Sequence, residues 1–125
     1  MDVCNDFLAG GMDLSDDLAK NRDDHAKEIE ATEAEIAKCR LQAGDILLTE
    51  GGDHDQLGRG SFWQEELAEC IHQNHIFRVR FSKDLLLPQF VSAQIGSPYG
   101  KKYFLTHAKQ TTGIASINQK VLSNF

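Results

Sequence analysis

Long hydrophobic runs, cysteine and positive charge are all scarce in this chain of 125 residues. No run of about 18 apolar residues exists, so the sequence offers no candidate membrane-spanning helix. The N-terminus is acidic and contains glycine, unlike a signal peptide, and we therefore expect a soluble, cytoplasmic protein. Cys4, Cys39 and Cys70 are odd in number, well separated and without a Cys-x-x-Cys pair. This pattern argues against a disulfide framework and a zinc knuckle, and it predicts reduced thiols.

The scarcity of positive charge is regional. The formal net charge is −6, from 13 Lys and Arg residues against 19 Asp and Glu residues. Residues 1–42 carry −6, residues 43–75 carry −6 and residues 76–125 carry +6. A polyanion could meet the C-terminal segment while the acidic part faces water or a basic partner. The alternative is an accidental gradient over a solvated surface.

The length fits one domain at most, and the apolar pattern predicts both strands and helices. A capping box at Thr32 and Glu35 predicts a helix ending near Arg40, and Pro88 marks either the first turn of a later helix or a break in it. The expected strands are residues 45–49, 60–63, 70–81 and 114–117; the expected helices are 32–40, 84–95, 99–108 and 118–122, the last capped by Asn118. Residues 1–27 are expected to be loop with a weak strand or helical turn, and residues 28–31 either a strand or a backward extension of the first helix.

The longest expected strand, residues 70–81, alternates between two faces. Ile71, Phe77 and Val79 fall on one face, which is expected to pack. Arg78 and Arg80 fall on the other face, which can carry charge. The aromatic residues assigned to the core are Trp63, Phe77, Phe81, Phe90 and Phe104.

Two glycine-framed stretches stand out from this background. They are GDILLTEGGDHDQLGRG at residues 44–60 and KQTTGIASIN at residues 109–118. Each sets an apolar, strand-like run beside a loop of small polar residues, so hydrogen-bond donors and acceptors are presented on a rigid edge. We interpret both stretches as parts of a recognition surface.

Together with CIHQNHIFRVR at residues 70–80 and SPYGKKYFL at residues 97–105, these stretches resemble the target-recognition domains of type I restriction-modification specificity subunits. The resemblance covers residues 32–118. It implies an α/β (α+β) fold with a mixed or antiparallel sheet and helices packed on one side. It also implies sequence-specific recognition of duplex DNA without catalysis.

The same resemblance implies methyltransferase (M) subunits and a restriction (R) subunit as partners. Those subunits bring S-adenosylmethionine and ATP, and this chain is expected to need no cofactor. The chain ends at Phe125, where the family usually continues into a Pro-rich turn and a long assembly helix, and the resemblance does not extend to the domain's first strands. We therefore expect a single, partial domain over residues 1–125. The alternative function is a truncated remnant that acts as a protein-interaction module without binding DNA.

Candidate DNA contacts come from the loops and from the basic C-terminal segment. Arg59 is the sole basic residue between Ala43 and His75, and it is expected to contact guanine or a phosphate unless it forms a salt bridge with Asp53 or Asp55. Lys101, Lys102 and Lys109 are expected to contact phosphates; the alternative is that they are ordinary solvent-exposed lysines. The full set is Glu50, Gly52, Asp53, His54, Gln56, Arg59, Asn74, His75, Lys101, Lys102, Lys109, Gln110, Thr111 and Thr112.

Catalytic and metal sites are not expected. Cys70-x-His72-x-x-His75 contains metal-binding residue types, but a strand would direct His72 and His75 to opposite faces. His54 lies between two aspartates without a neighbouring nucleophile, which leaves a small hydrolase as a weak option. The glycines at 51–52 and 58–60 lack a Walker lysine and the spacing of a dinucleotide loop.

Overall fold

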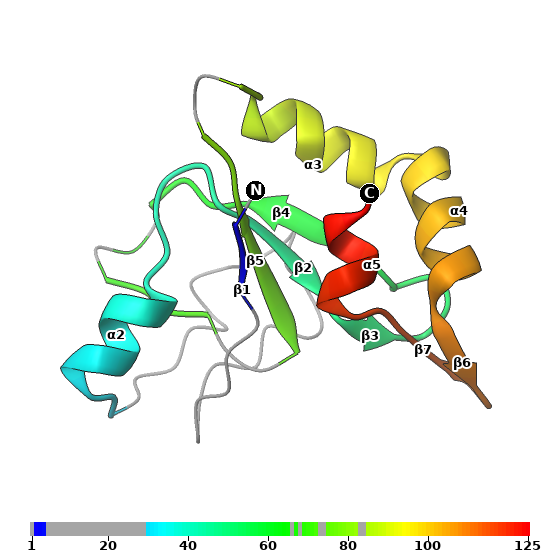
Figure 1. Cartoon of the computed structure of the whole chain (residues 1–125), viewed down its shortest axis with the longest axis horizontal. Coiled ribbons are helices and arrows are strands. Elements are labelled where there is room, and N and C mark those ends of the chain that lie inside the picture. Colours follow the sequence, from blue (N-terminus) through cyan, green and yellow to red (C-terminus); the bar gives the residue numbers. More distant parts are fainter. Residues whose placement is uncertain (1, 5–29, 66, 68, 73–74, 83–84) are drawn as a thin grey trace.

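The computed structural model describes residues 2–4, 30–65, 67, 69–72, 75–82 and 85–125 as two small antiparallel sheets with helices packed against them (Figure 1). This architecture confirms the predicted mixed α+β class with antiparallel pairing. The larger sheet has the order β1 (Asp2–Cys4), β5 (Ile76–Arg80), β2 (Ile46–Thr49) and β4 (Gly60–Phe62). The smaller sheet has the order β3 (Gly51–Gly52), β7 (Ile114–Ser116) and β6 (Lys109–Thr111).

Three helices begin at capping residues that the sequence supplies locally. At α2 (Glu33–Cys39), Glu35 N–H donates to Thr32 Oγ1 at 3.3 Å and Thr32 N–H donates to Glu35 Oε2 at 2.8 Å, which is the predicted capping box. At α4 (Pro98–His107), Gly100 N–H donates to Ser97 Oγ at 3.2 Å. At α5 (Gln119–Ser123), Val121 N–H donates to Asn118 Oδ1 at 3.0 Å, as predicted.

Helix α3 (Pro88–Gly96) is shorter than predicted. Leu87 is extended, with φ −79° and ψ 123°, because the ring of a following proline disfavours helical backbone. Pro88 is therefore at the first turn, and Leu85 and Leu86 precede the helix rather than belonging to it. Phe90 is 62% exposed, so its assignment to the core is wrong.

The core occupies both faces of the larger sheet. On one face, side chains from β2 and β5 pack with α3, α4 and α5; the buried members from these elements are Ile46, Leu48, Phe77, Val79, Val91, Ile95, Phe104 and Leu122. A second cluster consists of Leu41, Leu47, Trp63, Cys70 and Ile76. Successive residues of β2 thus join different clusters, which explains why this strand is a nearly continuous apolar run.

The predicted strand over residues 70–81 is wrong in its first half. β5 begins only at Ile76, because His75 has φ +66°, a conformation that interrupts extended pairing. Ile71 pairs instead with Arg40 in an isolated antiparallel bridge just after α2. Cys39 and Cys70 are both buried.

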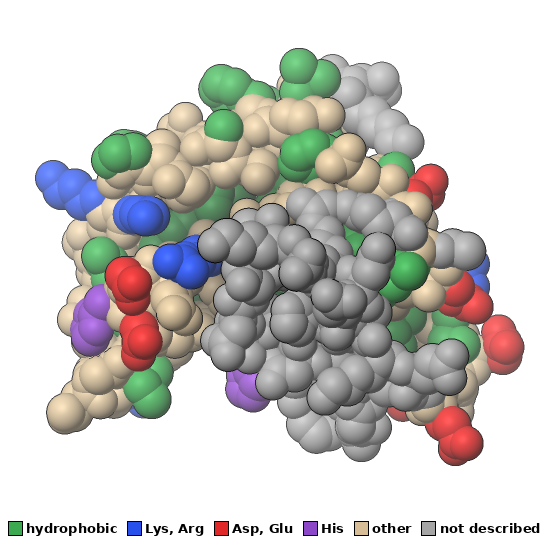
Figure 2. All heavy atoms as spheres, turned by 180° about the vertical axis from the view of Figure 1, so that it is seen from behind, with side chains coloured by type: hydrophobic (Ala, Val, Ile, Leu, Met, Phe, Trp, Pro, Cys, Tyr) green, Lys and Arg blue, Asp and Glu red, His purple; other side chains and the backbone are tan. Residues whose placement is uncertain are grey.

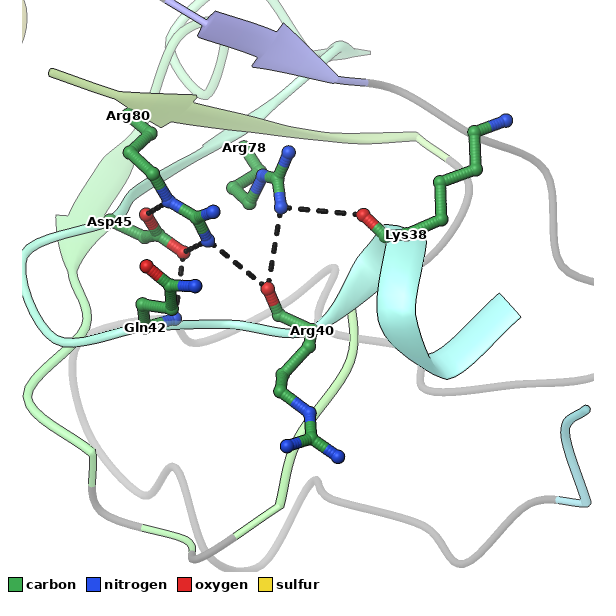
Figure 3. Close-up of polar contacts among 6 residues, drawn as sticks. All are labelled: Lys38, Arg40, Gln42, Asp45, Arg78 and Arg80. Carbon is green, nitrogen blue, oxygen red and sulfur yellow. Dashed lines mark hydrogen bonds and ion pairs between the residues drawn. The ribbon is translucent and has the colours of Figure 1, made fainter. Parts of the chain in front are cut away.

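The charged face of β5 lies against protein rather than solvent (Figure 3). Arg80 Nε and Nη2 donate to the two carboxylate oxygens of Asp45 at 2.6 and 2.7 Å, and the Asp45 side chain is 1% exposed. Arg78 is 5% exposed and Nη1 donates to the carbonyl oxygens of Lys38 and Arg40, at 3.4 and 3.3 Å. Both guanidinium groups therefore stabilise the junction of α2, β2 and β5.

Part of the N-terminal prediction lies outside the described residues. β1 matches the weak strand expected there, while residues 5–29 are not among those described. Glu30 and Ala31 have no regular structure, so neither predicted alternative forms at these two positions. Within the described ranges, no helix combines the length and apolar character needed to cross a membrane.

Candidate nucleic-acid interface

The two glycine-framed stretches, far apart in sequence, lie side by side in the smaller sheet (Figure 1). β3 pairs with β7 so that Gly51 faces Ser116 and Gly52 faces Ala115. A Cβ atom at Gly51 would lie 3.0 Å from the carbonyl oxygen of Ala115, so glycine suits this close approach of two backbones. The pairing fixes the loop after β3 beside the β6–β7 hairpin.

The loop after β3 is closed by backbone hydrogen bonds. Asp53 O accepts from Gln56 N at 2.8 Å and from Leu57 N at 3.1 Å, which forms a compact turn. The backbone of Arg59 is hydrogen-bonded through both of its polar groups: its N–H donates to Gln56 O at 3.1 Å and its carbonyl accepts from Thr49 N at 3.0 Å. The loop is thus built onto the end of β2.

The Arg59 side chain is exposed beyond this anchored backbone. Among the described residues, the ion pairs are Arg40–Glu69, His75–Glu50 and Arg80–Asp45. The alternative of a salt bridge from Arg59 to Asp53 or Asp55 is therefore wrong for this structure. Its guanidinium donors are available to a ligand.

Lysines flank the same edge from α4 and β6. Lys101 and Lys102 are exposed on α4, and Lys109 is exposed at the start of β6. Within the described part of the chain, none of the three side chains forms a hydrogen bond or ion pair. In Figure 2, which views the molecule from behind, basic and acidic side chains lie together at the edge that carries α4 and the hairpin in Figure 1.

The basic surface is smaller than the sequence count suggests. Of the seven basic residues in 76–125, Arg78 and Arg80 are engaged within the protein and Lys83 lies outside the described residues. The exposed lysines at this edge are Lys101, Lys102 and Lys109, to which Arg59 adds one charge, while Lys120 is exposed on α5. The acidic residues of the 53–55 turn are close in sequence to Arg59, so the interface has mixed charge.

Two candidate contact residues of β6 have local partners. Gln110 Nε2 donates to Leu105 O at 2.9 Å, which covers a carbonyl in the last turn of α4. Thr111 Oγ1 donates to Ile114 O at 3.4 Å across the hairpin. Thr112 is exposed in the turn itself. Gln110 retains its amide oxygen as an acceptor, and Thr112 retains its hydroxyl.

Glu50 and His75 connect the two sheets. His75 Nδ1 lies 3.1 Å from Glu50 Oε2, and Glu50 N–H donates to His75 O at 2.8 Å. On the other side, Ile117 N–H donates to Glu50 O at 2.9 Å, which ties this junction to the strand of the hairpin. Asn74, the adjacent candidate, lies outside the described residues.

The histidines considered as metal ligands or as a general base lie in different environments in the described part of the chain. His72 is 0% exposed whereas His75 is exposed, so the two imidazoles do not converge. Among the described residues, no group of three or more His, Cys, Asp or Glu side chains is placed to hold a metal ion. His54 and its flanking aspartates are exposed in the turn.

Sequence reasoning missed the Asp45–Arg80 pair. Asp45 and Arg80 are 35 positions apart, and only the antiparallel pairing of β2 with β5 brings them together. No protein-family model matches the chain, and no curated protein sequence is significantly similar to it.

Proposed function

We propose that this protein is a DNA-recognition module of the kind found in type I restriction-modification specificity subunits. The observation that supports this proposal best is the pairing of β3 with β7, which sets the Arg59 loop beside the hairpin that begins at Lys109. Exposed cations and polar groups from two distant segments then share one edge. Such an edge can contact both phosphates and base edges.

Under this proposal each residue type makes a different kind of contact with DNA. A guanidinium can donate two parallel hydrogen bonds to guanine O6 and N7, so Arg59 is the proposed base-reading residue. Lys101, Lys102 and Lys109 contact phosphates, which position the duplex without conveying sequence. Carboxylates at Asp53 and Asp55 can accept from the amino group of cytosine.

The proposed setting is the cytoplasm, in a complex with methyltransferase (M) subunits and a restriction (R) subunit. Methyl transfer from S-adenosylmethionine and ATP use belong to those partners, while this chain supplies the choice of DNA sequence. The chain alone is expected to bind duplex DNA weakly, with an affinity no better than about micromolar, because its net charge is −6.

Salt dependence of binding tests the proposal. Titration of a randomised duplex pool should show a linear loss of log affinity with log salt, with a slope of about −0.9 per phosphate contact. Changing Lys101, Lys102 and Lys109 together to Ala should reduce the slope by up to about 2.7. Lys120→Ala, on α5 and outside the candidate interface, is the matched control and should leave the slope unchanged. If the triple variant has the same slope as the unmodified chain, these lysines do not contact DNA.

A protein-interaction module without DNA binding is the second candidate. Exposed apolar side chains around the start of α3 favour it: Leu85 is 78%, Leu87 69% and Phe90 62% exposed. Figure 2 shows such side chains along the edge where Figure 1 places α3. The same titration separates the candidates, because this second function predicts no salt-sensitive affinity for any duplex.

A further inference from the structure

The turn that precedes Arg59 is seated on an aromatic ring of α4. Gly58 is buried and adopts φ +69°, a conformation that favours glycine. A Cβ atom built there would lie 2.7 Å from Cδ2 and 3.1 Å from Cε2 of Phe104. The ring therefore occupies the space that any other side chain at position 58 would need.

Both members of this contact are fixed by their surroundings. Leu57, beside Gly58, is 3% exposed and belongs to the main core. Phe104 is 0% exposed, and its ring centroid lies 5.5 Å from Tyr103 and 5.0 Å from Phe125. Tyr103 is in turn anchored by its hydroxyl, which donates to Val121 O at 3.0 Å. The contact is thus a rigid point in an otherwise exposed turn.

This rigid point lies between the two kinds of cation in the candidate interface. Arg59 follows Gly58 directly, and its own N–H and carbonyl are hydrogen-bonded to Gln56 and Thr49. Lys101 and Lys102 stand on the same helix as Phe104, less than one turn before it. A shift of the Phe104 ring relative to Gly58 would therefore move Arg59 relative to these lysines.

We propose that Phe104 is the positioning residue for Arg59, acting through Gly58. It holds the Arg59 guanidinium at a fixed distance from Lys101 and Lys102. Duplex DNA is therefore recognised only where a guanine lies at the matching distance from the phosphates that these lysines contact. This inference rests on the proposed DNA-recognition function and adds a residue that touches no DNA. Preorganised donors cost less ordering on binding than mobile ones, so the same contact also raises selective affinity.

The test uses Gly58→Ala, Phe104→Leu and the double variant, each in the full chain. Gly58→Ala puts a methyl group against the ring, and the double variant replaces the ring with a smaller, flexible side chain that can make room. Gly44→Ala is the control: Gly44 also has a positive φ, +94°, but lies outside the candidate interface and faces only the Pro88 ring, at 3.2 Å. It adds comparable backbone strain without touching the loop.

Two measurements separate the positioning role from the proposed function. One is amide hydrogen exchange at Arg59 and Thr49, whose N–H groups report on the loop closure without DNA. The other is the ratio of the affinity for a duplex selected from a randomised pool by the unmodified chain to the affinity for the pool itself. Gly58→Ala should accelerate exchange at both amides and abolish the roughly 5- to 150-fold discrimination of a bidentate arginine. The slope of log affinity against log salt should change by less than about 0.9, the value for one phosphate contact. The double variant should restore both readouts in part, and Gly44→Ala should alter neither.

Unchanged discrimination in Gly58→Ala would overturn the positioning role, as would failure of Phe104→Leu to restore either readout in the double variant. Equal loss in Gly44→Ala would overturn it too, because strain alone would then suffice. If the unmodified chain binds no duplex selectively, the proposed function fails and base reading by Arg59 fails with it. In that case a restored exchange rate in the double variant would still support the mechanical coupling of Phe104 to the loop.

Discussion

The arginines of this protein occupy two contrasting environments. At the junction of α2, β2 and β5, Arg78 and Arg80 donate to carbonyl oxygens and to the buried carboxylate of Asp45. At the edge formed by the smaller sheet and α4, Arg59 is exposed, with no hydrogen bond or ion pair from its side chain among the described residues. The same functional group therefore stabilises the fold in one region and is available for a ligand in the other. A charge count along the sequence cannot separate these two uses.

The largest effect is expected from breaking the buried side of this comparison. Asp45→Asn removes the charge that Arg80 faces, and the free energy of unfolding should fall by about 3 kcal/mol, the lower end for a broken buried pair, since the Arg80 side chain is 28% exposed. Urea denaturation measures the loss. Arg59→Ala is the matched control and should change stability by less than about 0.5 kcal/mol. Equal losses in both variants would erase the distinction between the two environments.

A smaller effect is expected from the exposed side, in binding rather than in stability. Arg59→Ala should reduce the preference for the selected duplex by about 1–3 kcal/mol, because a bidentate arginine discriminates among bases. Lys102→Ala should instead weaken all sequences about equally, because a phosphate contact carries no sequence information. Competition titrations with single-base variants of the duplex give both numbers. A uniform loss for Arg59→Ala would reassign this residue to the phosphates.

The smallest effect is expected where a charge is exposed but has a local partner. Hydrogen bonds from the Thr32 hydroxyl and then from the Thr32 backbone lower the pKa of Glu35 below its ordinary value of 4.5. Since the folded-state pKa is depressed, the carboxylate stabilises the protein above pH 4.5, and this contribution is lost as the pH falls through the folded-state value.

Urea midpoints of the unmodified protein and of Glu35→Gln, measured between pH 7 and about pH 3, test this effect. The unmodified protein should be slightly more stable at neutral pH, and the difference should shrink on acidification. Glu33→Gln, in the same helical turn but outside the capping box, is the control. A difference that grows at low pH would contradict the sign of the shift.

Local signals in the sequence predicted local structure well. The capping box at Thr32 and Glu35 and the Asn118 cap were confirmed, because each depends on residues three positions apart. The helix expected at 99–108 matches α4 within one residue at each end. The returning strand at 60–63 matches β4, because glycine and aromatic residues there mark a turn and a strand.

The failures have tertiary causes. Alternation in 70–81 predicted one strand, but the left-handed backbone at His75 and the bridge from Ile71 to Arg40 divide it. Arg80 has the pattern of a solvent-facing residue, and only pairing with a distant strand reveals its partner Asp45. The two stretches were predicted to belong to one recognition surface, but the sequence did not show how they join. The join depends on β3, which consists of two glycines and shows no strand propensity.

That two-glycine strand has a consequence for how recognition can change. The join between the loop and the hairpin is made by backbone alone, since neither Gly51 nor Gly52 contributes a side chain. Residues 53–56 emerge from it as a turn closed by its own main-chain hydrogen bonds. Side chains of residues 53–56 can therefore be substituted, or a turn from another protein grafted at this position, without changing the sequence of the smaller sheet. Specificity can drift at this position while the scaffold stays constant.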